Sequence, residues 1–216
     1  MSEQNRQGKL VVISGFSGVG KGTVVKELLK QYDHYALSVS MTTRAPREGE
    51  QHGISYYFVT KEEFEKAIGE GGFYEYANYQ GRYYGTPRAF VDASRERGMD
   101  VILEIEVQGA MQIKEKFPDT LLIFIATKDA AEMERRLTGR GTESFDQITG
   151  RLKAAVGEAE QMQHYDYVVI NDDLQECVAQ MNGIILTEPE GPRYDPAFKE
   201  QFVKDLEEIV AKRTVQ

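Results

Sequence analysis

The stretch that most constrains the fold is 13-ISGFSGVGKGTVVKELL-29, where an apolar run passes through glycines into a helical pattern. Glycines let backbone N–H groups converge on one point, and a helix N-terminus adds partial positive charge. The segment matches GxxxxGK between a strand-like run and a helix, which predicts a site for the phosphates of a nucleoside triphosphate. The alternative is an ordinary strand–turn–helix connection with chance glycines. The predicted binding residues are Gly15, Ser17, Gly18, Val19, Gly20, Lys21, Gly22 and Thr23.

The loop departs from the usual motif at one position. Gly22 follows Lys21, where a serine or threonine normally contacts Mg²⁺. Either Thr23 supplies the hydroxyl, or the ion is held through waters and substrate phosphates, which suits Mg²⁺. The ending GKGT resembles that of nucleoside monophosphate kinases.

Short, nearly continuous apolar runs alternate with helical stretches along most of the chain. Such runs are typical of strands buried on both faces, and the alternation predicts an α/β fold with a five-stranded, mostly parallel sheet flanked by helices. The expected strands are 9–14, 35–40, 101–106, 120–126 and 165–171, and the expected helices are 20–32, 108–117, 128–137, 146–163 and 173–181.

Residues 41–98 break this rhythm and predict a small inserted subdomain. Its expected elements are a strand at 54–59, a helix at 60–70 opened by a Thr60–Glu63 capping box, and two strands joined by a turn at Gly81. The triphosphate-binding core is then 1–40 with 99–186, including a mobile lid at about 139–150. Residues 187–216 form a linker and an amphipathic helix. The apolar stripe of this helix is expected either to pack on the core or to join a dimer. The stripe consists of Phe198, Phe202, Leu206 and Ile209.

Charge and cysteine content narrow the function classes. The net charge of −9 does not favour nucleic-acid binding, so anionic ligands must be attracted by local arginines and lysines. The single cysteine, Cys177, excludes an internal disulfide and fits a reducing compartment. With no apolar run near the ~20 residues of a membrane span and no apolar N-terminal signal, a soluble cytoplasmic protein is expected. Three scattered histidines suggest no metal site built from protein ligands.

A second anion site is indicated in 38-SVSMTTRAPREGEQHGISYYF-58. Arg44 and Arg47 lie three residues apart, and paired arginines suit a bidentate grip on a phosphate, although such a loop is as often only solvated. This segment resembles the guanylate kinase family, as do 75-EYANYQGRYYGT-86, 103-LEIEVQGA-110, 136-RLTGRGTES-144, 151-RL-152 and 170-INDDL-174. The resemblance covers residues 9–186 in the family's order. It implies transfer of the γ-phosphoryl group of ATP to GMP or dGMP, with Mg²⁺.

The resemblance also implies roles for individual residues. Arg44, Arg47, Tyr56 and Tyr84 hold the GMP phosphate, and Ser40, Glu75 and Thr86 contact guanine. Glu104 and Glu106 are the family's acidic pair, with Glu106 where aspartate is usual, and Asn171 contacts the adenine side. Lys21, Arg44, Arg136, Arg140 and Arg151 are the catalytic cations, the last three closing over the transferring group.

The chemistry of guanine supports Glu75 independently. The pairing edge of guanine offers two donors, N1–H and the N2 amino group, which one carboxylate can accept. Adenine instead presents an unprotonated N1, and sites built around substrate hydrogen bonds reject such analogues by ~10⁴ or more.

Two other function classes remain open at this point. Guanylate-kinase-like domains of scaffold proteins bind protein segments without activity, but the lysine and arginines above argue against that class. A kinase acting on another monophosphate or on a phosphorylated sugar is the third possibility. Some residues are expected to have structural roles only. Arg135 is expected to be a surface residue, Cys177 a core residue, and Tyr74, Tyr76 and Tyr79 the core of a small sheet.

Overall fold

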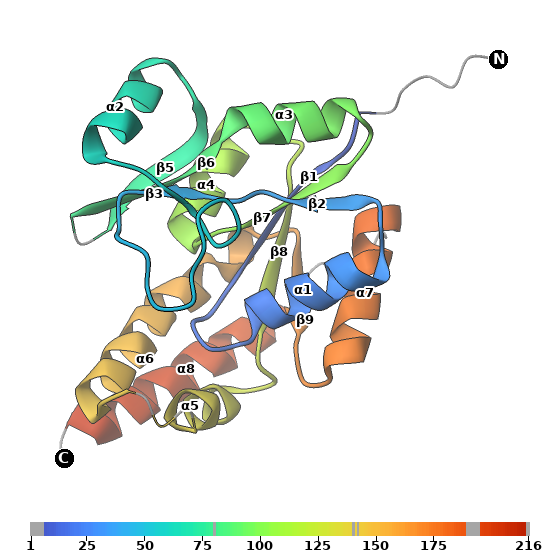
Figure 1. Cartoon of the computed structure of the whole chain (residues 1–216). Coiled ribbons are helices and arrows are strands. Elements are labelled where there is room, and N and C mark those ends of the chain that lie inside the picture. The colour runs from blue at the N-terminus through green and yellow to red at the C-terminus, as the bar shows by residue number, and fades with distance from the viewer. Residues whose placement is uncertain (1–6, 80, 140, 142, 189–194, 215–216) are drawn as a thin grey trace. The chain divides into compact units, whose positions relative to one another are not determined.

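The computed structural model describes residues 7–79, 81–139, 141, 143–188 and 195–214 (Figure 1). The chain divides into two compact units, which are described separately. Unit 1 comprises 1–12 and 32–121, and unit 2 comprises 13–31 and 122–216. The main sheet has five strands in the order β2-β7-β1-β8-β9. The predicted α/β fold with a five-stranded, mostly parallel sheet is therefore confirmed.

Unit 1 contains strands of the main sheet and a second, separate sheet. β2 (Tyr35–Leu37) pairs in parallel with β7 (Asp100–Glu104). A second, four-stranded sheet has the order β4-β3-β6-β5 and lies within the segment expected to form a subdomain. Its strands are β3 (Met41–Thr42), β4 (Tyr57–Phe58), β5 (Phe73–Tyr79) and β6 (Arg82–Pro87), and the helices of the unit are α2 (Lys61–Gly69), α3 (Arg88–Glu96) and α4 (Val107–Lys116).

Unit 2 carries the helix that follows the glycine-rich loop. β1 (Leu10–Gly15) crosses into it at residue 13, and β8 (Leu121–Ala126) pairs in parallel with β9 (Tyr167–Ile170). Figure 1 shows α5, α6 and α8 gathered together within this unit. The helices are α1 (Lys21–Gln31), α5 (Ala130–Thr138), α6 (Phe145–Glu160), the short 3₁₀ helix η1 (Gln161–His164), α7 (Leu174–Thr187) and α8 (Pro196–Thr214).

Burial and capping explain why these segments form where they do. Every residue of β1 and of β8 is buried, as expected for strands covered on both faces. The predicted Thr60–Glu63 capping box opens α2, and a second box of Ser144 and Gln147 opens α6. Cys177 is buried in α7, which confirms it as a core residue.

Two local expectations are wrong. The strand expected at 54–59 is reduced to Tyr57–Phe58. Tyr74 is buried, but Tyr76 is 38% exposed and Tyr79 is 65% exposed, so only the first belongs to the core. For Tyr76 the cause is a register shift between Phe73 and Tyr76 on the edge strand β5, because such a shift changes which face the following side chain occupies. Tyr79 is the last residue of β5.

The three-part domain division expected from the sequence stays a prediction. Within the expected lid, residues 145–150 form the first turns of α6, and residues 140 and 142 lie outside the described part of the chain. Each helix in the described ranges is too short or too polar to span a membrane.

Candidate active site

The glycine-rich loop of unit 2 runs from the end of β1 at Gly15 to the start of α1 at Lys21. At Gly15 (φ 150°) a Cβ would lie 2.2 Å from the carbonyl oxygen of Ile125, so no side chain fits against β8. At Gly20 (φ 91°) a Cβ would lie 2.9 Å from Nδ2 of Asn171. Both positions combine a left-handed backbone with a close approach, which explains why the loop requires glycine there.

Lys21 and Asn171 both bind the backbone of this loop. The Lys21 ammonium donates to the carbonyl oxygens of Gly15 at 2.6 Å and Phe16 at 3.2 Å. The Asn171 amide, buried just after β9, donates to the carbonyl oxygen of Val19 at 2.7 Å. Asn171 thus braces the loop, and its expected contact with adenine stays a prediction.

Two of the predicted catalytic arginines lie at the same loop. Arg136 on α5 donates to the carbonyl oxygen of Val19 at 3.4 Å and pairs with Glu132 at 2.7 Å. Arg151 on α6 donates to the Ser17 hydroxyl, and its Nε lies 2.7 Å from a carboxylate oxygen of Glu143. Two helices therefore bring cations to the loop. The third predicted arginine, Arg140, lies outside the described residues.

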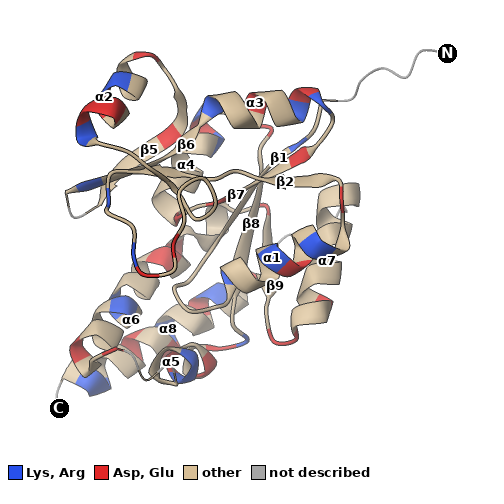
Figure 2. Ribbon diagram, in the orientation of Figure 1, with Lys and Arg blue, Asp and Glu red and all other residues tan. Residues whose placement is uncertain are grey.

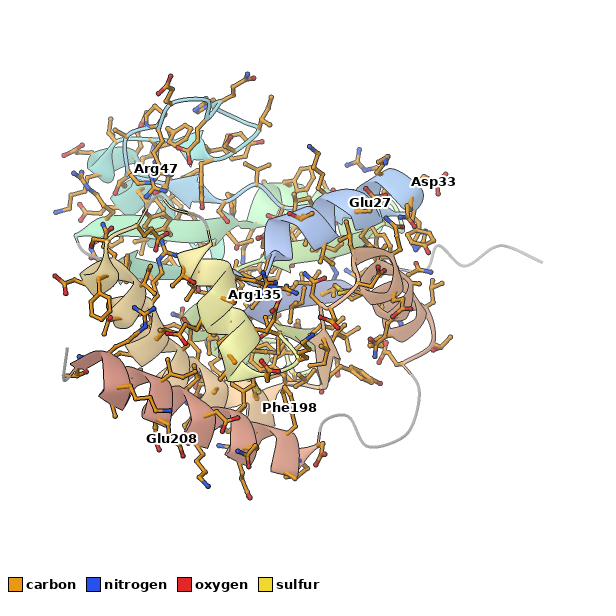
Figure 3. All side chains as sticks on the ribbon, turned by 90° about the horizontal axis from the view of Figure 1, so that it is seen from below. Glu27, Asp33, Arg47, Arg135, Phe198 and Glu208 are labelled. Atoms are coloured by element: carbon orange, nitrogen blue, oxygen red, sulfur yellow. The ribbon has the colours of Figure 1, made fainter. Side chains whose placement is uncertain are left out.

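Glu132 links the two neighbouring arginines of α5. It accepts hydrogen bonds from Arg135 and Arg136, and these bonds lower the pKa of its carboxyl to about 2. Arg135 is exposed, as expected of a surface residue, and Figure 3 labels it on α5.

In unit 1, Arg44 lies in the segment after β3 and is held by neighbouring side chains. The Arg44 guanidinium forms two hydrogen bonds with the Glu50 carboxylate, at 2.9 and 2.8 Å, and lies 5.4 Å from the centre of the Tyr56 ring. The Tyr84 ring is 6.1 Å from that of Tyr56, and the pair with Glu50 raises the pKa of Arg44. Three of the four residues expected at the GMP phosphate thus lie together.

Arg47, the fourth, is exposed and is labelled in Figure 3. Its backbone N–H donates to the Glu50 carboxylate at 2.7 Å. Glu50 therefore ties both ends of the Arg44–Arg47 segment, and its pKa is lowered by the hydrogen bonds from Arg44.

The predicted guanine-binding carboxylate is a buried group. Glu75 on β5 is 5% exposed, and it accepts a hydrogen bond from the Thr86 hydroxyl of β6 at 2.7 Å. Burial raises its pKa, against the opposing effect of the Thr86 hydrogen bonds. Gly109 of α4 lies so close that a Cβ there would be 2.9 Å from Oε2 of Glu75.

The remaining substrate residues are more dispersed. Ser40 precedes β3, and its carbonyl oxygen accepts from the backbone N–H of Tyr57 at 2.9 Å. Glu104 ends β7, and its charge contributes to the raised pKa of Tyr56, which burial mainly causes. Glu106 was expected to lie on the same strand as Glu104, within the strand predicted at 101–106. That is wrong, because β7 ends at Glu104 and Glu106 is the exposed N-cap residue of α4.

Sequence reasoning missed the glutamates that partner the arginines. Glu50 and Glu143 are acidic residues within the motifs already quoted, and Glu132 precedes Arg136 by one helical turn. Their proximity in sequence to the arginines was the available signal. Gly109, also missed, is part of the quoted stretch 103–110.

The donor set suits a magnesium ion carried in with the nucleotide. Among the described residues, no cluster of three His, Cys, Asp or Glu side chains could hold a metal. Thr23 is exposed on the first turn of α1 and is the one hydroxyl directly after Gly22. Mg²⁺ prefers oxygen ligands and commonly keeps several waters while binding substrate phosphates, so the Thr23 hydroxyl is of a type that fits it.

A glycine-rich loop between a buried strand of an α/β sheet and a helix, with a lysine and two arginines upon it, defines a phosphate-loop nucleotide-binding protein. Comparison with known proteins gives the family. The family model described as guanylate kinase matches residues 7–188. The chain belongs to the guanylate kinase family, and it is therefore an enzyme, a phosphotransferase.

Individual relatives agree with this assignment. The chain is 50% identical over 184 residues to a guanylate kinase of Lactiplantibacillus plantarum, covering 85% of this chain and 89% of that protein. It is 44% identical over 202 residues to a guanylate kinase of Clostridioides difficile, covering 93% and 98%. A crystal structure of guanylate kinase from Anaplasma phagocytophilum is similar with a TM-score of 0.69 at 31% identity, covering 91% of this chain and 94% of that one.

Proposed function

We propose that the chain catalyses the reversible, Mg²⁺-dependent transfer of the γ-phosphoryl group of ATP to GMP or dGMP, giving ADP and GDP or dGDP. Phosphorylation of GMP at the expense of ATP follows from membership of the guanylate kinase family. The ion, the use of dGMP and the roles of individual residues are the proposal. Acceptance of dGMP is expected because the proposed contacts reach the base and the phosphate.

The observation that carries the acceptor assignment is the buried Glu75 carboxylate. One of its oxygens already accepts from Thr86, and it lies against a glycine, which leaves little room to turn. A carboxylate fixed in this way accepts the N1–H and N2–H donors of guanine. Ser40 can donate to O6, whereas Thr86 could do so only by withdrawing its single hydroxyl proton from Glu75. A buried acceptor left facing the lone pair of adenine would lose its hydrogen bonds, which is the costly case.

The GMP phosphate would bind at Arg44, Arg47, Tyr56 and Tyr84. The Arg44 guanidinium is held in one plane by Glu50, and such preorganised arginines suit bidentate contact with phosphate. The incoming phosphate has two negative charges and either shares the guanidinium or displaces Glu50 from it. Glu104 and Glu106 are proposed to contact the nucleotide from the end of β7 and the start of α4.

The triphosphate of ATP would lie on the loop from Gly15 to Thr23, with Asn171 on the adenine side. Lys21, Arg136, Arg140 and Arg151 would neutralise the charge that spreads over the transferring group, which is the main catalytic requirement of this chemistry. A phosphate oxygen of GMP attacks the γ-phosphorus, the bond from that phosphorus to the bridging oxygen breaks, and ADP leaves with the electron pair. Mg²⁺ would neutralise part of the charge on the phosphates, and Thr23 could supply a hydroxyl that helps to hold it.

The proposed small-molecule partners are ATP and GMP, and the proposed location is the cytoplasm. The single cysteine is buried in α7, which suits a reducing compartment. The overall charge of −9 gives no support for nucleic-acid binding.

A coupled assay of ADP release tests the function, with GMP, dGMP, AMP, UMP and CMP as acceptors. The expected result is turnover with GMP and dGMP and at least ~10⁴-fold lower kcat/KM with AMP. Turnover with AMP above that with GMP would refute the guanine assignment. No turnover with any acceptor, from protein that binds nucleotide, would favour a binding module instead.

A further inference from the structure

The C-terminal helix α8 packs on the phosphate-binding parts of unit 2. Phe202 of α8 is 2% exposed, and its ring stacks on that of Phe16 with centroids 4.9 Å apart and 5° between planes. Phe16 is the second residue of the glycine-rich loop. Its ring also meets Phe124 of β8 edge-on at 4.9 Å. The loop is thus anchored by one aromatic side chain lying between the sheet and α8.

The other end of α8 contacts the two helices that carry catalytic arginines. Nε of Arg213 lies 2.6 Å from a carboxylate oxygen of Glu134 on α5, and its guanidinium lies 4.8 Å from the centre of the Phe145 ring. Glu134 is two residues before Arg136, and Phe145 is the first residue of α6, which carries Arg151. Arg213 therefore contacts both α5 and α6.

The contacts of α8 are partly or fully buried. The Arg213 side chain is only 12% exposed, so its ion pair is less screened than a solvated one. The ribbon in Figure 2 has acidic and basic positions interspersed along α5, α6 and α8, and Figure 3 labels Phe198 and Glu208 on α8. Phe202 and Leu206, the centre of the apolar stripe, are buried within the chain. The centre of the stripe therefore packs within the chain, as the first of the two alternatives expected from the sequence.

We propose that α8 is a positioning element of the ATP site. Phe202 positions the glycine-rich loop through Phe16, and Arg213 positions Arg136 and Arg151 through Glu134 and Phe145. The family model ends at residue 188, so α8 adds to the part of the chain that it matches. The match to the Clostridioides difficile relative covers 93% of the chain and so extends into α8. The proposal rests on the proposed function, because it assigns the contacts to ATP.

The first test uses Phe202→Leu, which keeps most of the buried volume and removes the ring stack. Titration calorimetry with ADP alone and with GMP alone measures each site without turnover. The expected result is an ADP affinity about tenfold weaker with a GMP affinity within twofold of wild type. The matched control is Phe64→Leu, since Phe64 is equally buried and stacked, but on Phe73 and Tyr83 of unit 1. This control should leave ADP affinity unchanged at a similar loss of thermal stability.

The second test uses Arg213→Gln, which keeps a polar side chain near the C-terminal end of α8 and should fold. We expect kcat to fall about tenfold with KM for GMP unchanged, while the neighbouring exposed Lys212→Gln behaves as wild type. The double variant Glu134→Gln/Arg213→Gln should be no worse than either single variant, because all three lose the same ion pair.

The outcomes separate this inference from the proposed function. If wild type binds ADP but does not phosphorylate GMP, the proposed function is refuted. The ADP titrations still test whether α8 positions the glycine-rich loop. If Phe202→Leu weakens ADP and GMP binding equally, or leaves ADP binding within twofold, the loop is not positioned by α8. An unchanged kcat in Arg213→Gln refutes the proposal that Arg213 positions Arg136 and Arg151.

Discussion

Gly109 is the position at which one added methyl group should separate guanine recognition from ATP binding. In Gly109→Ala the new Cβ would lie 2.9 Å from Oε2 and 3.2 Å from Cδ of Glu75. Ordinary carbon–oxygen contacts are longer, so the carboxylate must retreat by roughly 0.5 Å. It has little room to do so, because it is buried and its other oxygen is bound to Thr86.

The cost can be bounded from two opposing effects. Alanine favours the helix by ~0.5–1 kcal/mol over glycine, which partly offsets the clash in overall stability. Displacing the carboxylate weakens a charge-assisted hydrogen bond worth ~1.5–3 kcal/mol and misaligns the acceptor for guanine. A loss of ~1.4–2.8 kcal/mol at guanine corresponds to a 10- to 100-fold fall in kcat/KM for GMP.

The assay is steady-state ADP release with GMP and ATP varied in turn, alongside thermal unfolding. KM for ATP should stay within twofold of wild type. Gly157→Ala is the matched control, since it is also a helical glycine but a Cβ there meets nothing within 4 Å. Its kinetic constants should be those of wild type. An unchanged kcat/KM for GMP in Gly109→Ala, or an equal rise in both KM values, would refute the reasoning.

Three further predictions concern charged groups. Lys21→Ala should lower kcat at least ~100-fold without unfolding the chain, as circular dichroism and kinetics can check, and an unaffected kcat would remove Lys21 from the site. Because burial raises the pKa of Glu75, KM for GMP should rise as pH falls through that raised pKa, whereas Glu75→Gln should have a high KM with no such step. Dividing one pH profile by the other removes the titration of the GMP phosphate itself. Parallel pH profiles for the two proteins would contradict the assignment. The pKa of Glu132 is lowered to about 2 by Arg135 and Arg136, so its contribution to stability is present above about 4.5 and is lost as pH falls towards 2. Urea unfolding should show the stability difference between wild type and Glu132→Gln shrinking across that window, and a constant difference would count against it.

Much of the fold was predictable because the sequence pattern and the physics agree locally. The strands β1 and β8 are continuous apolar runs, and the capping box at Thr60 marks the start of α2. Such elements depend on neighbours along the chain. Tyr76 was placed wrongly because a register shift between strands changes which face a residue occupies, and no local pattern contains it.

The site was predictable as a set of residues but not as a set of pairs. The resemblance assigns Arg44 and Arg151 to phosphates, but it does not say what binds them when no phosphate is there. Their partners, Glu50 and Glu143, became visible only when the folded chain placed the charges within hydrogen-bond reach. Glu106 shows the opposite error, because a strand period was extended past the point where β7 ends.

If Arg44, Arg136 and Arg151 bind phosphates as proposed, their glutamate partners make nucleotide binding an exchange of anions. Each guanidinium already has a carboxylate neighbour, so an arriving phosphate gains only the difference between two attractions. On the proposed roles, the displaced glutamates would return to the arginines as product departs, which would offset part of the cost of releasing a highly charged diphosphate.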